Sequence, residues 1–135
     1  MPPAQATLQP LSPLSRWLPP AVFAALILVA TSWPDLDLGR FPTRFDKLGH
    51  LMMYGVFGAL VIRATSRPAA WATAAWAWIG IASFAAADEW HQNFISGRGA
   101  SLGDWAADLT GALLGIVIAR RLLTLKTPRR PDPTK

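Results

Sequence analysis

The sequence contains no cysteine, and only 16% of its residues are charged. The first absence excludes disulfides, thiolate catalysis and cysteine-ligated metals. The second leaves little polar surface for a soluble domain of 135 residues, although a soluble bundle with continuously apolar core helices is the alternative. No P-loop, Gly-x-Ser-x-Gly or HExxH string occurs, so no common motif of this kind assigns a reaction.

Long apolar runs make up most of the chain, of which 52% is hydrophobic. Four runs, at about 18–33, 48–64, 69–87 and 105–123, approach the roughly 20 residues with which a helix crosses a bilayer. The sequence therefore predicts an all-α membrane domain, a bundle of four transmembrane helices at 17–125, between a leader at 1–16 and a basic tail at 126–135. A cleaved signal peptide is the alternative for the first run, but Trp17 and Trp33 flank it like interfacial anchors of a retained helix.

Basic residues are distributed unevenly between the two sides that four spans would define. Nine lie with the two termini and the turn after the second run, and four lie on the other side. The nine are Arg16, Arg63, Arg67, Arg120, Arg121, Lys126, Arg129, Arg130 and Lys135; the four are Arg40, Arg44, Lys47 and Arg98. The positive-inside rule therefore predicts that both termini are cytoplasmic. The net charge of +5 therefore says little about nucleic acid, which we do not expect as a partner.

Acidic residues show the opposite distribution. Seven of the eight fall on the predicted outer side or in the outer half of a span: Asp35, Asp37, Asp46, Asp88, Glu89, Asp104 and Asp108. A charged residue at the centre of a membrane helix costs roughly 2.5 to 3.5 kcal/mol on insertion scales, so such residues usually mark a site or a pathway. The sequence therefore predicts that two remote segments bring their polar groups together at the outer surface.

Helical spacing indicates which of these groups can meet. Asp46, His50 and Tyr54 recur every four residues and therefore share one face of a helix. Asp108 shares a face with the glycines of 111–115, a small-xxx-small pattern on which another helix can approach closely. We therefore expect Asp108 to lie in a helix contact, with His50 or Arg98 as its partner.

Helix capping is the alternative explanation for some of the acids. The segments 43–46 and 101–104 both match the [ST]-x-x-[DE] capping box. Helix capping would therefore explain the acids that end them, Asp46 and Asp104, without a functional role. Asp88 and Glu89 have no such role, because carboxylates at the C-terminal end of a long helix oppose its macrodipole. These two acids are therefore the stronger functional candidates.

Two groups of site residues follow. We predict an acid and base set, in which pKa values shift easily at low dielectric, of Asp88, Glu89, His50 and Asp108. We predict ligand contacts from Asp46, Lys47, Tyr54, Gln92, Arg98, Ser101 and Asp104. Lys47 and Arg98 lie near the starts of two helices, where they favour an anionic head group. No residue is assigned to a metal, and no motif indicates a cofactor.

These residues together resemble a known family. The strings D-K-x-x-H at 46–50, D-E-x-x-Q at 88–92, G-R at 97–98 and D-x-x-x-[ND]-x-x-G at 104–111 occur in the order found in VanZ-like membrane proteins. The resemblance covers about residues 45–118 and differs at Asp108, where the family pattern often has Asn. The family is named for a protein that gives resistance to the glycopeptide teicoplanin. The resemblance implies a small multi-helix protein of the bacterial inner membrane with an envelope role.

Three functional hypotheses and a structural role remain open. The leading hypothesis is a protein that binds or modifies an envelope lipid, a lipid-linked cell-wall intermediate or an amphiphilic glycopeptide drug. The second is a metal-dependent or acid/base hydrolase or transferase using Asp88, Glu89, His50 and His91. The third is a proton-coupled transporter, which would need a homo-oligomer because four short spans enclose little volume. A purely structural helper is the remaining alternative.

Overall fold

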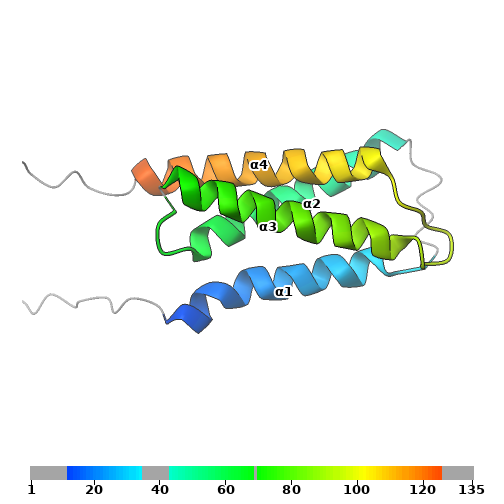
Figure 1. Cartoon of the computed structure of the whole chain (residues 1–135), viewed down its shortest axis with the longest axis horizontal. Helices are drawn as coiled ribbons and strands as arrows, with labels where there is room; N and C mark the ends of the chain where they lie inside the picture. Colours follow the sequence, from blue (N-terminus) through cyan, green and yellow to red (C-terminus); the bar gives the residue numbers. More distant parts are fainter. Residues whose placement is uncertain (1–11, 35–42, 69, 126–135) are drawn as a thin grey trace, which may run out of the picture.

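The computed structural model describes residues 12–34, 43–68 and 70–125, which form four helices. These are α1 (Pro13–Thr31), α2 (Thr43–Ala64), α3 (Trp71–Gln92) and α4 (Leu102–Leu125). They lie side by side in an up-down-up-down bundle, in which α1 and α3 run one way and α2 and α4 the other (Figure 1). The predicted all-α fold is confirmed, and the described ranges contain no strand.

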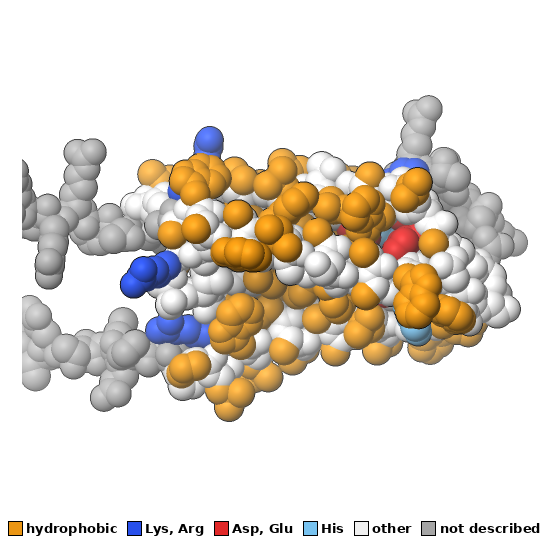
Figure 2. All heavy atoms as spheres, in the orientation of Figure 1, with side chains coloured by type: hydrophobic (Ala, Val, Ile, Leu, Met, Phe, Trp, Pro, Cys, Tyr) orange, Lys and Arg blue, Asp and Glu red, His pale blue; other side chains and the backbone are white. Residues whose placement is uncertain are grey.

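The surface of the bundle is that of a membrane protein. Three segments are long and apolar enough to cross a membrane, namely Pro13–Thr31, Phe45–Ala64 and Leu102–Leu125. Hydrophobic side chains cover the length of the bundle in Figure 2, and Trp76 for example is 72% exposed. α3 has 22 residues and lies alongside the other helices, while its crossing of the membrane stays a prediction.

Three of the helices extend well beyond the apolar runs that predicted them. α1 begins at Pro13, in the first turn of a helix capped by Ser12, whose hydroxyl accepts a hydrogen bond from Ser15 N at 3.2 Å. Proline suits this position because it has no amide hydrogen to satisfy. α2 begins at Thr43, and α3 continues to Gln92. The boundaries of the leader and tail stay predictions, and the ranges 1–11 and 126–135 lie outside the described residues.

Glycines allow α2 and α4 to approach closely. A Cβ atom added to Gly111 would lie 2.1 Å from the carbonyl oxygen of Leu51, and one added to Gly115 would lie 1.9 Å from that of Gly55. Both distances are far shorter than van der Waals contact, so the two backbones touch directly where side chains are absent. The small-xxx-small contact expected from the sequence is confirmed, and its partner is α2.

Aromatic rings fill the middle of the bundle. Phe57 stacks on Phe23 with ring centroids 6.4 Å apart and contacts Phe84 at 5.4 Å, while Tyr54 meets Phe57 edge-on at 6.2 Å. The hydroxyl of Tyr54 points out of this apolar layer, because it hydrogen-bonds Asp88. The aromatic layer therefore separates the apolar core from one end of the bundle. That end holds the last turns of α1 and α3 and the first turns of α2 and α4, and it is here called the polar end.

Candidate functional site

Asp88 lies at the centre of the polar end and joins three helices. Its Oδ1 accepts a hydrogen bond of 2.7 Å from the Thr31 hydroxyl on α1, and its Oδ2 accepts one of 3.3 Å from the Tyr54 hydroxyl on α2. Asp88 is 2% exposed. A buried carboxylate is tolerated when hydrogen-bond donors replace its lost water, and here two hydroxyls do so.

Two pairs of side chains connect α2 to α4. His50 Nδ1 lies 3.0 Å from Asp108 Oδ1, and Lys47 Nζ lies 2.7 Å from Asp104 Oδ1. An ionised Asp108 only accepts, so it would pair with the tautomer of His50 that carries its hydrogen on Nδ1. Asp108 is 1% exposed, whereas the side chain of Lys47 is 47% exposed, so the inner pair is shielded from solvent and the outer pair is not. The sequence left His50 and Arg98 as possible partners of Asp108, and the structure shows that the partner is His50.

Glu89 takes a role that the capping-box prediction gave to Asp104. Ser101 caps α4, since its hydroxyl accepts a hydrogen bond of 3.3 Å from Asp104 N. In a capping box the acid would return to the amide of Ser101, but that amide donates to Glu89 Oε1 instead. The carboxylate of Asp104 pairs with Lys47. The prediction of a capping role for Asp104 was therefore wrong, and Glu89 is held by the start of α4.

The connection between α3 and α4 is a tight turn that positions Arg98. Gly97 has φ 79°, a conformation that side chains rarely adopt, and Arg98 Nη1 donates to Gln92 Oε1 at 3.3 Å. Asn93 Oδ1 accepts a hydrogen bond of 2.9 Å from Ala100 N, which closes the turn. Arg98 therefore lies next to the last turn of α3, and its partner is Gln92 and not Asp108.

Several buried polar atoms of the polar end have no hydrogen-bond partner in the part of the chain that the structure describes. They are Glu89 Oε2, Gln92 Nε2, Arg98 Nε and Trp105 Nε1. A buried polar atom without a partner costs roughly 1 to 3 kcal/mol, more if it is charged, and such atoms are rare in folded proteins. All of them come from residues 89–105, so the unmet hydrogen-bonding capacity is concentrated beside α3 and α4.

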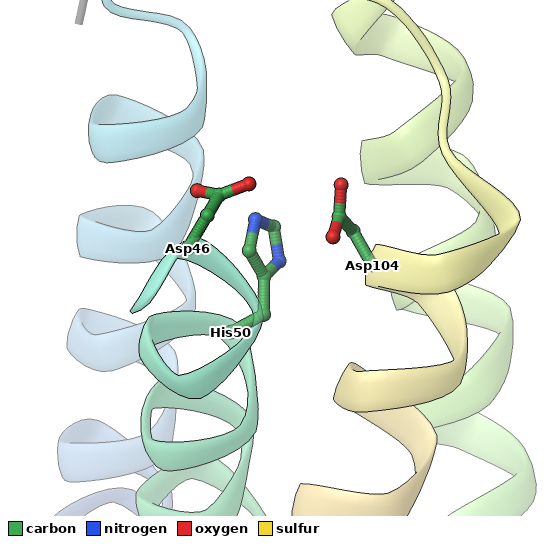
Figure 3. A group of neighbouring side chains, drawn as sticks. All are labelled: Asp46, His50 and Asp104. Carbon is green, nitrogen blue, oxygen red and sulfur yellow. The ribbon is translucent and has the colours of Figure 1, made fainter. Parts of the chain in front are cut away.

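The structure brings together one group that can hold a metal ion. Potential ligand atoms of Asp46, His50 and Asp104 lie within 4.8 Å of one another, with the imidazole between the two carboxylates (Figure 3). Imidazole and carboxylate suit zinc or manganese. The ammonium of Lys47 competes for this place, because it already contacts Asp104.

This group differs from the metal set proposed from the sequence. Both oxygens of Asp88 are engaged by hydroxyls, and His91 is exposed at the end of α3. Of that set only His50 belongs to the group in Figure 3.

All the residues proposed for the site lie at the polar end, but not in one layer. His50, Tyr54, Asp88, Glu89, Gln92 and Asp108 are buried, whereas Asp46 and Lys47 are exposed. Sequence reasoning missed Thr31 and the indole of Trp105. Thr31 could have been noticed as a polar residue near the C-terminal end of the first apolar run, but nothing local linked it to Asp88.

A family model described as VanZ/LLP1 matches residues 5–124, which is most of the chain. No curated protein and no solved structure matches it.

Proposed function

This chain belongs to the VanZ/LLP1 family, and we propose that its polar end faces the outside of the bacterial inner membrane and binds or modifies an envelope amphiphile there. The ligand is an envelope lipid, a lipid-linked cell-wall intermediate or a glycopeptide antibiotic. Such an activity would contribute to envelope function or to resistance to cell-wall antibiotics.

The observation that carries this proposal is that some buried polar atoms of the polar end are hydrogen-bonded and others are not. Asp88 and Asp108 are hydrogen-bonded and almost fully buried, so their side chains are held in place. The polar atoms without a partner belong to residues 89–105, at the same end of the bundle. A purely structural cluster would be expected to satisfy these atoms internally, whereas a binding site leaves them for the ligand.

The charges of the polar end support an amphiphile with a polar head. Lys47 and Arg98 lie near the starts of α2 and α4 and the end of α3, and five acids lie at the same end of the bundle. The acids are Asp46, Asp88, Glu89, Asp104 and Asp108. A site with both signs of charge next to an apolar helix surface suits a charged head group attached to a hydrocarbon chain.

Lipid extraction tests this proposal directly. We expect the protein purified from its own membranes to retain an envelope amphiphile that mass spectrometry identifies, and we expect Arg98→Lys to retain less of it because Lys lacks the planar fork of Arg. Arg67→Lys, an exposed change between α2 and α3, is the matched control. Equal retention by both variants and the wild type would contradict binding at the polar end.

Cysteine labelling tests the orientation. Because the chain has no cysteine, single cysteines at Ser66 and Gly99 report each end of the bundle without background. We expect a membrane-impermeant maleimide to label Gly99→Cys in intact cells and Ser66→Cys only after permeabilisation. The opposite result would place the polar end in the cytoplasm, and labelling of both from one side would show that α3 does not cross the membrane.

A metal-dependent hydrolase or transferase is the second candidate, and the cluster of Asp46, His50 and Asp104 favours it. If that cluster binds a metal, Lys47→Met should strengthen Mn²⁺ or Zn²⁺ binding about tenfold by removing a competing positive charge; the gain is modest because Lys47 is half exposed. Adding His50→Gln should abolish the gain. Isothermal titration of both variants measures this, and unchanged weak binding in Lys47→Met would eliminate the metal candidate.

A further inference from the structure

A hollow opens between the last turns of α3 and the first turns of α4. It has a volume of about 330 Å³ and is lined by Ala86, Glu89, Trp90, Asn93, Ala100, Ser101, Leu102 and Trp105. Ligand sites in proteins range from about 300 to 1,000 Å³, so the hollow has room for a head group but not for a whole lipid. Figure 2 shows acidic atoms among hydrophobic ones toward the end of the bundle that lies opposite the start of α1 and the end of α4.

Two of the unpartnered atoms belong to residues that line this hollow. Glu89 is 7% exposed; its Oε1 accepts from Ser101 N, but its Oε2 has no partner in the described ranges. The indole Nε1 of Trp105 is likewise buried without an acceptor. A ligand that satisfies both atoms must therefore supply a hydrogen-bond donor to the carboxylate and a hydrogen-bond acceptor to the indole.

The charge of Glu89 and the tryptophans of the lining indicate that the ligand's donor is a cation. No Lys or Arg of the described segments pairs with Glu89, and Asp104 and Asp108 lie on the first turns of the neighbouring α4. Two tryptophans line the hollow, Trp105 and the 67% exposed Trp90. A carboxylate combined with tryptophan rings is the environment in which ammonium groups bind, through an ion pair and a cation–π contact.

We infer that the hollow binds the primary ammonium group of a membrane amphiphile, with Glu89 Oε2 accepting its N–H and Trp105 Nε1 donating to an oxygen of the same head group. The inference deepens the proposed function and rests on it, since it identifies the head group that the polar end takes. An ethanolamine phospholipid carries both features, an ammonium and phosphate oxygens a few bonds away. The hydrocarbon chain then lies along the apolar outside of α3 and α4.

Binding of defined lysophospholipids tests the inference. The protein in a non-ionic detergent is titrated with lysophosphatidylethanolamine, lysophosphatidylcholine and lysophosphatidylglycerol of equal chain length, and binding is followed by native mass spectrometry. We expect affinity to fall in that order, by about tenfold from the first to the last, because choline has no N–H and glycerol has no positive charge. Equal affinities for all three would overturn the inference.

Two variants assign the effect to the hollow. Glu89→Gln keeps an oxygen for Ser101 N but removes the charge, and Trp105→Phe keeps a ring but removes the N–H. We expect Glu89→Gln to abolish the preference for ethanolamine over choline and glycerol, and Trp105→Phe to weaken all phosphate-bearing ligands several-fold, about the value of one hydrogen bond. Trp76→Phe, on the exposed middle of α3, is the matched control. Wild-type selectivity in Glu89→Gln would overturn the inference even if Trp105→Phe bound weakly.

The source of the ammonium is tested by glycerophosphoethanolamine, which has the same head group without a chain. We expect it to compete at least tenfold less effectively than the lysolipid, since the chain adds buried apolar contact. Equal competition would show that the ligand is a soluble amine and not an amphiphile. Loss of the cellular phenotype in Asp88→Asn together with absent ammonium selectivity would overturn this inference and leave the proposed function standing.

Discussion

Replacing Gly115 with alanine is expected to separate α2 from α4 and destabilise the folded protein by roughly 3 kcal/mol, the upper end of the usual cost of overpacking. The added Cβ would lie 1.9 Å from the carbonyl oxygen of Gly55, which is backbone and cannot rotate away. One helix must therefore shift. Unfolding in mixed detergent micelles, followed by circular dichroism, measures the loss.

Gly80→Ala is the matched control for this prediction. Gly80 lies within α3 and a Cβ there meets nothing within 4 Å. Alanine is a better helix former than glycine by about 1 kcal/mol, so this variant should be as stable as the wild type or slightly more so. If Gly115→Ala were as stable as Gly80→Ala, the close contact of α2 with α4 would be wrong, and with it the facing of Asp108 to His50.

The fold was largely predictable because its signals are local. Each helix coincides with an apolar run, and the glycines spaced four residues apart on α4 predicted a close contact with another helix. Helix ends were less predictable, since hydropathy falls at Asp46 and Asp88 while backbone hydrogen bonding continues through them. The end of an apolar run is therefore not the end of a helix.

Which polar residues gather at one end of the bundle was predictable, but their pairing was not. Spacing placed His50 and Asp108 on inward faces, and the two do meet. Which donor reaches which acid is decided by residues far apart in sequence, as when Thr31 bonds Asp88 or the amide of Ser101 bonds Glu89. Local patterns cannot contain that information, and the capping box at 101–104 therefore predicted the wrong partner for Ser101.

Neutralising Asp88 is expected to abolish the envelope phenotype without unfolding the protein. Asparagine keeps one oxygen for the Thr31 hydroxyl, and its amide can donate to the Tyr54 oxygen, so both contacts persist, the second with donor and acceptor exchanged. The negative charge is lost. Susceptibility to a cell-wall antibiotic is measured in a host where this protein changes it, with equal membrane levels of each variant checked by immunoblot. We expect Asp88→Asn to behave like the empty vector.

The control for this experiment is Asp132→Asn, the same chemical change in the predicted cytoplasmic tail, outside the described residues. It should leave susceptibility unchanged. A general acid or base supplies about 10² to 10⁴ in rate and a charge-assisted hydrogen bond about ten- to hundredfold in affinity, so either role of Asp88 makes the difference from Asp132 large. Full activity in both variants would mean that Asp88 is structural.

Asp108→Asn separates charge from hydrogen bonding at the second buried acid, and we expect it also to abolish the phenotype. Its Oδ1 can still accept the Nδ1–H of His50, so the contact between α2 and α4 should persist and the stability should change little. What disappears is the negative charge opposite His50, which can orient or move a proton at the polar end. The change also restores the residue that VanZ-like proteins often have at this position. Full activity in Asp108→Asn would therefore show that a hydrogen bond to His50 is sufficient, and it would remove Asp108 from the acid and base set while leaving Asp88 in it.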